Sequence, residues 1–105
     1  MIILTTSEVF KESLQVYKHI ISYPAMPGHT DKMFAGCPDF CSINYNHEPF
    51  SVILHRNGAD WREAIFVDND NDNVLAARRE GVTSIQFKNT RQLKAALRRQ
   101  GFRFE

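Results

Sequence analysis

Three aspartates at alternate positions, Asp68, Asp70 and Asp72, are the residues of this chain whose types and spacing best suit chemistry. A short apolar run, residues 65–67, leads into them, and a second apolar run, residues 84–87, follows a stretch with helical character. Strand, acidic loop, helix and strand in that order have the spacing of a parallel βαβ unit. In open α/β sheets the loops at the carboxyl ends of strands carry the ligands, so Asp68 is expected where a ligand binds.

The strands that position these aspartates are predicted from four short apolar runs: residues 2–4, 41–45, 64–67 and 83–87. Because helices alternate with them, we predict an α/β fold, a three-layer Rossmann-like sandwich with a four-stranded, mostly parallel sheet. Right-handed crossovers favour the strand order 2-1-3-4. In that order the first and third strands end side by side, so Thr5, Thr6 and Asp68 are expected to share one crevice.

The first two helices are predicted from apolar positions at helical spacing. One begins at Thr6 or Ser7, either of which can cap it, and continues to about residue 22. Residues 24–48 contain several Pro and Gly and are expected to be irregular. Pro49 suits the first turn of a second helix, with a strand over residues 50–54 as the alternative.

The last two helices have clearer ends. One is predicted from about residue 71 to residue 80, where Gly81 terminates it. The other follows Thr90, which is expected to cap it, and ends at Gly101. Its apolar side chains should face the sheet, with the two Phe that follow it folded back on the core: Leu93, Ala96, Leu97, Phe102 and Phe104.

Length and composition indicate one globular domain over residues 1–105, with 43% hydrophobic residues and eight Phe. The formal net charge of +1 gives no bulk attraction to nucleic acid or membrane, and no apolar stretch has membrane-spanning length. The N-terminus has no basic region or cleavage site typical of a signal peptide. Two Cys are compatible with reduced thiols, so a cytoplasmic location is expected.

From Ala64 onward the chain resembles the last conserved motif and following strand of the haloacid dehalogenase (HAD) superfamily, whose members are mostly phosphatases. In that family an acidic pair, or two acids separated by three residues, holds Mg²⁺, and the next helix carries Ala-Ala-Arg and ends in Gly. The matching residues here are Asp68, Asn69 in place of the second acid, Asp72, Asn73, Ala76, Ala77, Arg78 and Gly81. The resemblance implies a Mg²⁺ site formed by Asp68, Asp72 and Asn69.

Upstream the chain departs from the family. A HAD phosphatase carries a nucleophilic Asp at the end of its first strand, and here Thr5 and Thr6 occupy that place. If this strand instead matches the family's second strand, Thr5 matches the phosphate-holding hydroxyl and the nucleophile strand is absent. The family's phosphate-holding Lys also has no match, because only His47 or Glu48 stands near its position.

The resemblance therefore implies a reduced HAD-like domain without phosphatase activity. Such a domain would bind a divalent metal, a phosphorylated ligand or a protein partner at the strand ends. The alternative is a Mg²⁺-dependent phosphohydrolase that uses Asp68 with Thr5 or Thr6, with Lys32 or Lys88 as the available Lys. A carboxylate brought near Asp68, such as Asp39 or Glu48 or one from a second chain, would favour the enzyme.

The acidic loop also has a purely structural interpretation. Asp and Asn are common in turns because their side chains accept hydrogen bonds from nearby backbone amides. On this interpretation the loop is a solvated connection and Asp72 caps the following helix.

Two further groups could bind partners. The irregular segment contains four potential zinc ligands, but their spacings match no standard module, so free Cys and surface His are the favoured interpretation: His29, Cys37, Cys41 and His47. The last helix and its flanks are basic, which nucleic acid could exploit, but a solvated outer face explains the same residues and is favoured: Lys88, Arg91, Lys94, Arg98, Arg99 and Arg103. The exposed edge of a short sheet could pair with a second copy or another protein.

Overall fold

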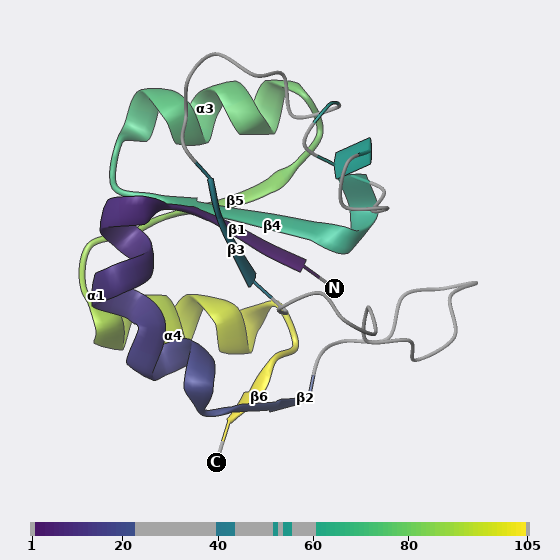
Figure 1. The fold of residues 1–105 in the computed structure, drawn as a ribbon. Helices are drawn as coiled ribbons and strands as arrows, with labels where there is room; N and C mark the ends of the chain where they lie inside the picture. The colour runs from purple at the N-terminus through teal and green to yellow at the C-terminus, as the bar shows by residue number, and fades with distance from the viewer. Residues whose placement is uncertain (1, 23–39, 44–51, 53, 56–60, 105) are drawn as a thin grey trace.

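The computed structural model describes residues 2–22, 40–43, 52, 54–55 and 61–104. Its main sheet has four parallel strands in the order β3-β1-β4-β5. The strands are β1 (Ile2–Thr6), β3 (Phe40–Ile43), β4 (Ala64–Asp68) and β5 (Thr83–Gln86). The helices are α1 (Ser7–Lys18), the short 3-10 helix η1 (Trp61–Glu63), α3 (Asn71–Arg79) and α4 (Thr90–Arg99). Helix α3 covers one face of the sheet, and α1 and α4 cover the other (Figure 1).

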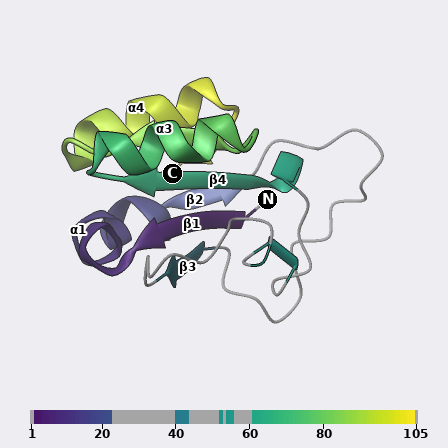
Figure 2. The ribbon, with the colours of Figure 1, turned by 90° about the horizontal axis from the view of Figure 1, so that it is seen from above.

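The predicted α/β class is confirmed. The four strands also lie in the order expected from right-handed crossovers, because the second predicted strand is β3 and the third is β4. The pairing of β1 with β4 matches Thr5 with Val67, so these two strands end together. Figure 2 shows their arrowheads at the same end of the sheet.

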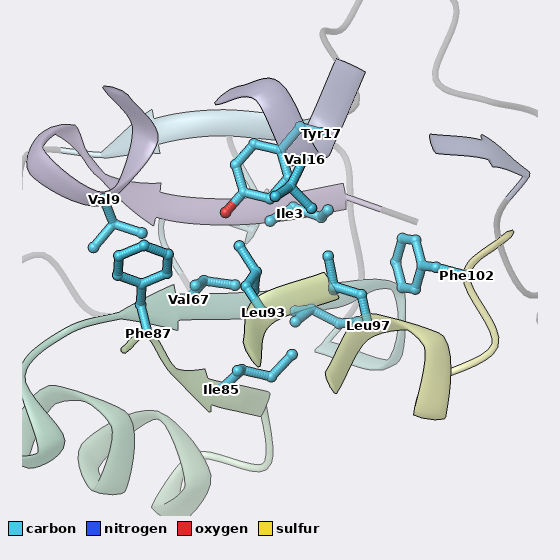
Figure 3. Packing of buried hydrophobic residues seen from close by; sticks show 11 residues of the cluster. Ile3, Val9, Val16, Tyr17, Val67, Ile85, Phe87, Leu93, Leu97 and Phe102 are labelled. Atoms are coloured by element: carbon cyan, nitrogen blue, oxygen red, sulfur yellow. The ribbon is translucent and has the colours of Figure 1, made fainter. Parts of the chain in front are cut away.

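Strand β4 is the most buried element because it lies between two parallel neighbours and beneath helices on both faces. All five of its residues are buried. Val67 points into the core between the sheet and helices α1 and α4, toward Leu93 (Figure 3), and Ile65 belongs to the same buried cluster. Phe66, fully buried, points to the opposite face by the alternation of a strand.

Helix α3 is attached to the sheet through Ser84 of β5. The buried Ser84 hydroxyl lies 3.1 Å from the carbonyl oxygen of Val74 in α3, to which it donates. Arg78 of the same helix donates to the carbonyl oxygen of Ser84 at 3.2 Å. These bonds hold α3 in register with β5 and so fix the position of the loop that precedes α3.

The first helix is shorter than predicted. Helix α1 ends at Lys18, and residues 20–22 form a strand, β2 (Ile20–Ser22), which pairs antiparallel with β6 (Arg103–Phe104). The apolar spacing used for the prediction also fits a strand, and β-branched Ile20 and Ile21 favour that conformation once a partner strand is present. A partner from the other end of the chain therefore decided the outcome.

Two helix starts also differ from the predictions. Thr6 occupies the residue before α1, as expected, but its side chain makes no capping hydrogen bond. For α4 the capping residue is Asn89 and not Thr90: the Asn89 side chain accepts from the backbone N–H of Gln92 at 2.8 Å. Asn at this position is as good a cap as Ser or Thr, and one residue separates the two choices.

The ends of the last two helices agree with the predictions. Gly81 has a φ of 85° and Gly101 a φ of 101°, the left-handed region that glycine adopts without strain. Beyond Gly101, Phe102 is buried in the core beside Leu97 and Phe104 packs against it. Leu93 and Leu97 are fully buried, and Ala96 is partly buried against the same cluster.

Some predictions fall outside the described residues. These include most of the irregular segment 24–48, the end of the predicted second strand at 44–45 and the proposed helix start at Pro49. Within residues 50–55, the three described positions Val52, Leu54 and His55 are helical, which agrees with the helix and not the alternative strand. None of the helices in the described part of the chain has the length and apolar character that a membrane span needs.

The buried phenol of Tyr17 makes the free energy of unfolding decrease as the pH rises into the alkaline range. Its side chain is 2% exposed, and burial raises the pKa of the phenol, while a hydrogen bond with Ser13 acts weakly in the opposite direction. The unfolded chain ionises this phenol near pH 10, whereas the folded chain keeps it protonated. The stabilisation is therefore complete below pH 10 and is lost as pH rises above it.

We predict that the stability difference between the wild type and Tyr17→Phe shrinks above pH 10, by up to about 1.4 kcal/mol per pH unit. Urea unfolding at pH 8.5, 10 and 11 measures this difference. The comparison cancels the other groups that titrate in this range, since both proteins contain them. A difference that stays constant across the three pH values would contradict the buried, protonated phenol.

Candidate functional site

Asp68 is the last residue of β4 and is 1% exposed. One carboxylate oxygen, Oδ1, accepts a hydrogen bond from the backbone N–H of Asp70 at 3.1 Å. The other, Oδ2, accepts from the side-chain amide of Asn73 at 2.8 Å. A buried carboxylate needs such donors, and these two bonds fold the acidic loop back over the strand end.

Asp70 caps helix α3. Its Oδ1 accepts from the backbone N–H of Asp72 at 2.9 Å, and its own backbone is extended, as for a residue before a helix. The structural interpretation assigned this role to Asp72, and that assignment is wrong by two residues. Asp72 lies within the first turn, where its exposed negative charge is favourable beside the free N–H groups of the helix.

The three aspartates therefore differ in environment although their spacing is regular. Asp68 is buried and hydrogen-bonded on both oxygens, whereas Asp70 and Asp72 are exposed. Asn69, between Asp68 and Asp70, is also exposed, and its carbonyl oxygen accepts a hydrogen bond from the side-chain amide of Gln86 at 3.4 Å. Gln86 pairs with Asp68 in the register of β4 and β5, so this bond connects the ends of the two strands.

Thr5 and Thr6 lie at the end of β1, next to the end of β4, as the sequence predicts. Thr5 is fully buried, and its hydroxyl donates to the carbonyl oxygen of Thr6 at 3.0 Å. Because Thr5 is matched with Val67, it faces the α1 and α4 side of the sheet, while Thr6 shares the α3 side with Asp68. Of the two hydroxyls, only that of Thr6 is therefore on the same face as the carboxylate.

The Thr6 hydroxyl is an unusual feature of this edge. Its oxygen Oγ1 is buried and makes no hydrogen bond with any of the described residues. A buried hydroxyl without a partner costs free energy, so such a group is commonly explained by a strain, a water or a ligand. It lies on the strand next to the one that ends in Asp68.

The predicted metal ligands are brought to one loop but do not form a ready cluster. No set of three His, Cys, Asp or Glu side chains within the described ranges is placed to hold a metal ion. Asp68, Asp72 and Asn69 belong to one turn of chain, and each Asp68 oxygen keeps a second lone-pair site besides the hydrogen bond it accepts. The residue types fit Mg²⁺, which uses one or two carboxylates and retains water in its remaining positions.

Of the two lysines considered for contacting a phosphorylated ligand, Lys88 is the one that the structure places at this edge of the sheet. It follows β5, the neighbour of β4, and its side chain is exposed. Its backbone N–H donates to the side chain of Gln92 at 3.1 Å, and the amide of Gln92 donates to the carbonyl oxygen of Gln86 at 3.0 Å. These bonds fix the loop between β5 and α4 at the carboxyl end of the sheet.

The remaining candidates cannot be placed. The side chains of His29, Cys37, Cys41 and His47, the possible zinc ligands, lie outside the described residues, although the backbone of Cys41 belongs to β3. The same applies to Lys32, Asp39 and Glu48, which the catalytic alternative would require. The zinc hypothesis and the hypothesis of a second carboxylate both remain untested predictions.

Sequence reasoning missed the two glutamines that connect the loops. Gln86 lies within the apolar run 84–87 and Gln92 lies in a polar helix turn, so neither shows a pattern that predicts its hydrogen bonds. Asn73 was singled out by the family motif alone, and the structure assigns it a contact with the Asp68 carboxylate.

Comparison with known proteins identifies no relative: no family model, no curated protein and no solved structure matches the chain. The HAD resemblance of residues 64–87 thus rests on the motif residues themselves.

The hydrogen bonds of Asp68 predict that its replacement destabilises the fold more than replacement of its exposed neighbour. Asp68→Ala should lower the free energy of unfolding by about 1.5–3 kcal/mol, because two donors lose a charged acceptor. The control Asp72→Ala loses only a favourable helix-end charge and should cost less than about 1 kcal/mol. Equal losses in chemical denaturation of the two variants would contradict the structural role of Asp68.

Proposed function

We propose that this chain is a reduced HAD-like domain that binds a divalent cation, Mg²⁺, at the carboxyl ends of β1 and β4, without phosphatase activity. The observation that carries the proposal is the buried Asp68 carboxylate at the end of the central strand, on the same face as the unpartnered hydroxyl of Thr6. In three-layer Rossmann-like folds this switch point between strands is where ligands bind.

Asp68, Asp72 and Asn69 are the residues that would hold the cation. Asp68 is preorganised, since the bonds from Asp70 and Asn73 fix its carboxylate before any ligand arrives. Asp72 and Asn69 are exposed and free to turn toward a cation. Mg²⁺ bound there would offer positive charge to a phosphorylated ligand, and Lys88 from the neighbouring loop would add to it.

We infer the absence of phosphatase activity from the environment of Asp68. A nucleophilic carboxylate has to reach a phosphorus atom with one free oxygen, in line with the leaving group. Both Asp68 oxygens accept hydrogen bonds from its own loop, so each keeps a lone-pair site for a cation but neither is free of hydrogen bonds for attack on phosphorus. Of the two hydroxyls that the alternative could use, Thr5 faces the other side of the sheet and only Thr6 shares the face of Asp68.

Three further properties of the protein are also proposed. These are a cytoplasmic location, a phosphorylated small molecule or a protein as the further ligand, and pairing of two copies through a sheet edge. Each becomes worth testing once cation binding has been measured.

We predict that Mg²⁺, titrated from 0.1 to 20 mM, shifts the backbone amide NMR signals of the loop around Asp68 to Asp72 with millimolar or tighter affinity. Asp72→Asn should weaken binding at least fivefold without unfolding the protein, because it removes an exposed ligand. The matched control is Glu80→Gln, which removes one exposed acid from the other end of α3.

Three outcomes would count against the proposal. Shifts spread evenly over all acidic residues would indicate counter-ion screening and not a site. Equal effects of Asp72→Asn and Glu80→Gln would have the same meaning. Mg²⁺-dependent hydrolysis of p-nitrophenyl phosphate that is lost in Asp68→Asn would replace the proposal with the phosphohydrolase alternative.

A further inference from the structure

The positive charge of this chain is concentrated in its C-terminal part. Residues 88–105 contain six of the thirteen Lys and Arg and one of the twelve Asp and Glu, so their formal charge is +5, while residues 1–87 carry −4. Helix α4 contains four of these cations and no acid. It lies on the face of the sheet opposite α3, whose first turn follows the acidic loop (Figure 1). The near-neutral total thus conceals an uneven distribution of charge along the chain, with the excess of cations in its last 18 residues.

Three of the cations form a row along α4. Arg91, Lys94 and Arg98 are spaced by three and four residues, which places them on one side of a helix. At 1.5 Å per residue, the steps along the helix axis are about 4.5 and 6 Å. Leu93 and Leu97, on a neighbouring side of α4, are fully buried in the core. Arg91 and Arg98 are exposed and Lys94 is partly buried, so the row lies along the solvent-facing flank of the helix.

Phe104 of β6 supports this row. The Lys94 ammonium nitrogen lies 5.5 Å from the centroid of the Phe104 ring, and the Arg98 guanidinium carbon lies 5.8 Å from it. Both are within the range of cation–π attraction, which restrains long side chains that would otherwise be free to rotate. Phe104 is itself fixed by its pairing with Ile20 of β2 and by its packing on the core.

The row is not neutralised within the described part of the chain. No ion pair joins Arg91, Lys94 or Arg98 to a described acidic side chain. Surface cations usually lie among acids, as on the outer face of α1, where Glu8, Lys11 and Glu12 are interspersed. Three cations without such acids, two of them restrained by Phe104, form a site of concentrated positive potential.

We propose that the row Arg91, Lys94 and Arg98 binds the phosphodiester backbone of a nucleic acid. A nucleic acid strand carries one negative charge per about 3.4 Å of its axis, dense enough for every cation of the row to meet a phosphate. Arg also offers its guanidinium plane to unstacked bases. This surface is separate from the Asp68 site, so the inference does not depend on the proposed function.

Other anionic partners fit this surface less well. A helix that enters a membrane interface needs a large exposed apolar face, and both Leu of α4 are buried. A stable protein interface needs an apolar centre, whereas the outward side of α4 has Ala95 between its cations. Phosphate contacts need neither, because they obtain their free energy from released counter-ions.

The test is fluorescence anisotropy with a labelled 20-nucleotide single strand and the matching duplex, between 20 and 200 mM NaCl. Three phosphate contacts predict that log K falls against log[salt] with a slope of about −2 for the single strand and about −2.7 for the duplex. The double variant Arg91→Gln/Arg98→Gln should weaken binding at least tenfold at 20 mM salt and reduce the single-strand slope by about 1.4.

The matched control is Lys11→Gln/Arg79→Gln, which removes two exposed cations from α1 and α3 and changes the net charge equally. It should change binding less than twofold. Equal weakening by the two double variants would show that net charge alone acts and would overturn the proposal. So would no binding at 20 mM salt to either oligonucleotide, or binding only to vesicles of anionic lipid. Thermal unfolding of each variant confirms that it is folded.

Discussion

The constraint on which the rest of the structure depends is the burial of β4 between two strands and two layers of helix. A strand buried on both faces contributes apolar area to two cores at once, which is why every residue from Ala64 to Asp68 is buried. The last of these residues, Asp68, carries a carboxylate, so the free energy gained by burying the strand requires hydrogen-bond donors for this buried group. The donors are provided by the loop that follows, through the backbone of Asp70 and the amide of Asn73. Burial of the strand therefore dictates the shape of the acidic loop.

The same arrangement connects packing with the candidate site. The loop cannot move without uncovering the Asp68 carboxylate. Helix α3 cannot move without breaking the hydrogen bond that the Ser84 hydroxyl donates to the carbonyl oxygen of Val74. Hydrogen bonds of the Gln86 and Gln92 side chains connect the same loop to β5 and to helix α4. A ligand at this edge would meet a largely preformed surface, with the exposed side chains of Asn69 and Asp72 as the adjustable part.

Where contacts are local, the sequence was a reliable guide. The positions of the four strands of the main sheet, their order and the glycines that end α3 and α4 all follow from short-range patterns and from the handedness of crossovers. The neighbourhood of Thr5, Thr6 and Asp68 followed from the same rules. Which threonine shares a face with Asp68 could not be decided, because it depends on a register of one residue between β1 and β4.

Errors arose where two residues compete for one role or where a distant segment intervenes. Asp70 and Asp72, and likewise Asn89 and Thr90, are chemically equivalent caps, so only backbone geometry distinguishes them. The end of α1 was assigned to a helix because nothing near Ile20 reveals that Phe104 will pair with it. The charge row on α4 was visible in the sequence, but its lack of acidic partners and its contact with Phe104 required coordinates.

The small β2 and β6 ribbon has a consequence for the order in which the chain can fold as it is made. During synthesis β1 emerges before β4, one of the two strands with which it pairs, and β2 emerges before its partner β6. The β1 edge that pairs with β4, and the whole of β2, therefore stay unpaired until those later residues have left the exit tunnel. Pairing of β2 with β6 is then the step that joins the segment after α1 to the segment after α4.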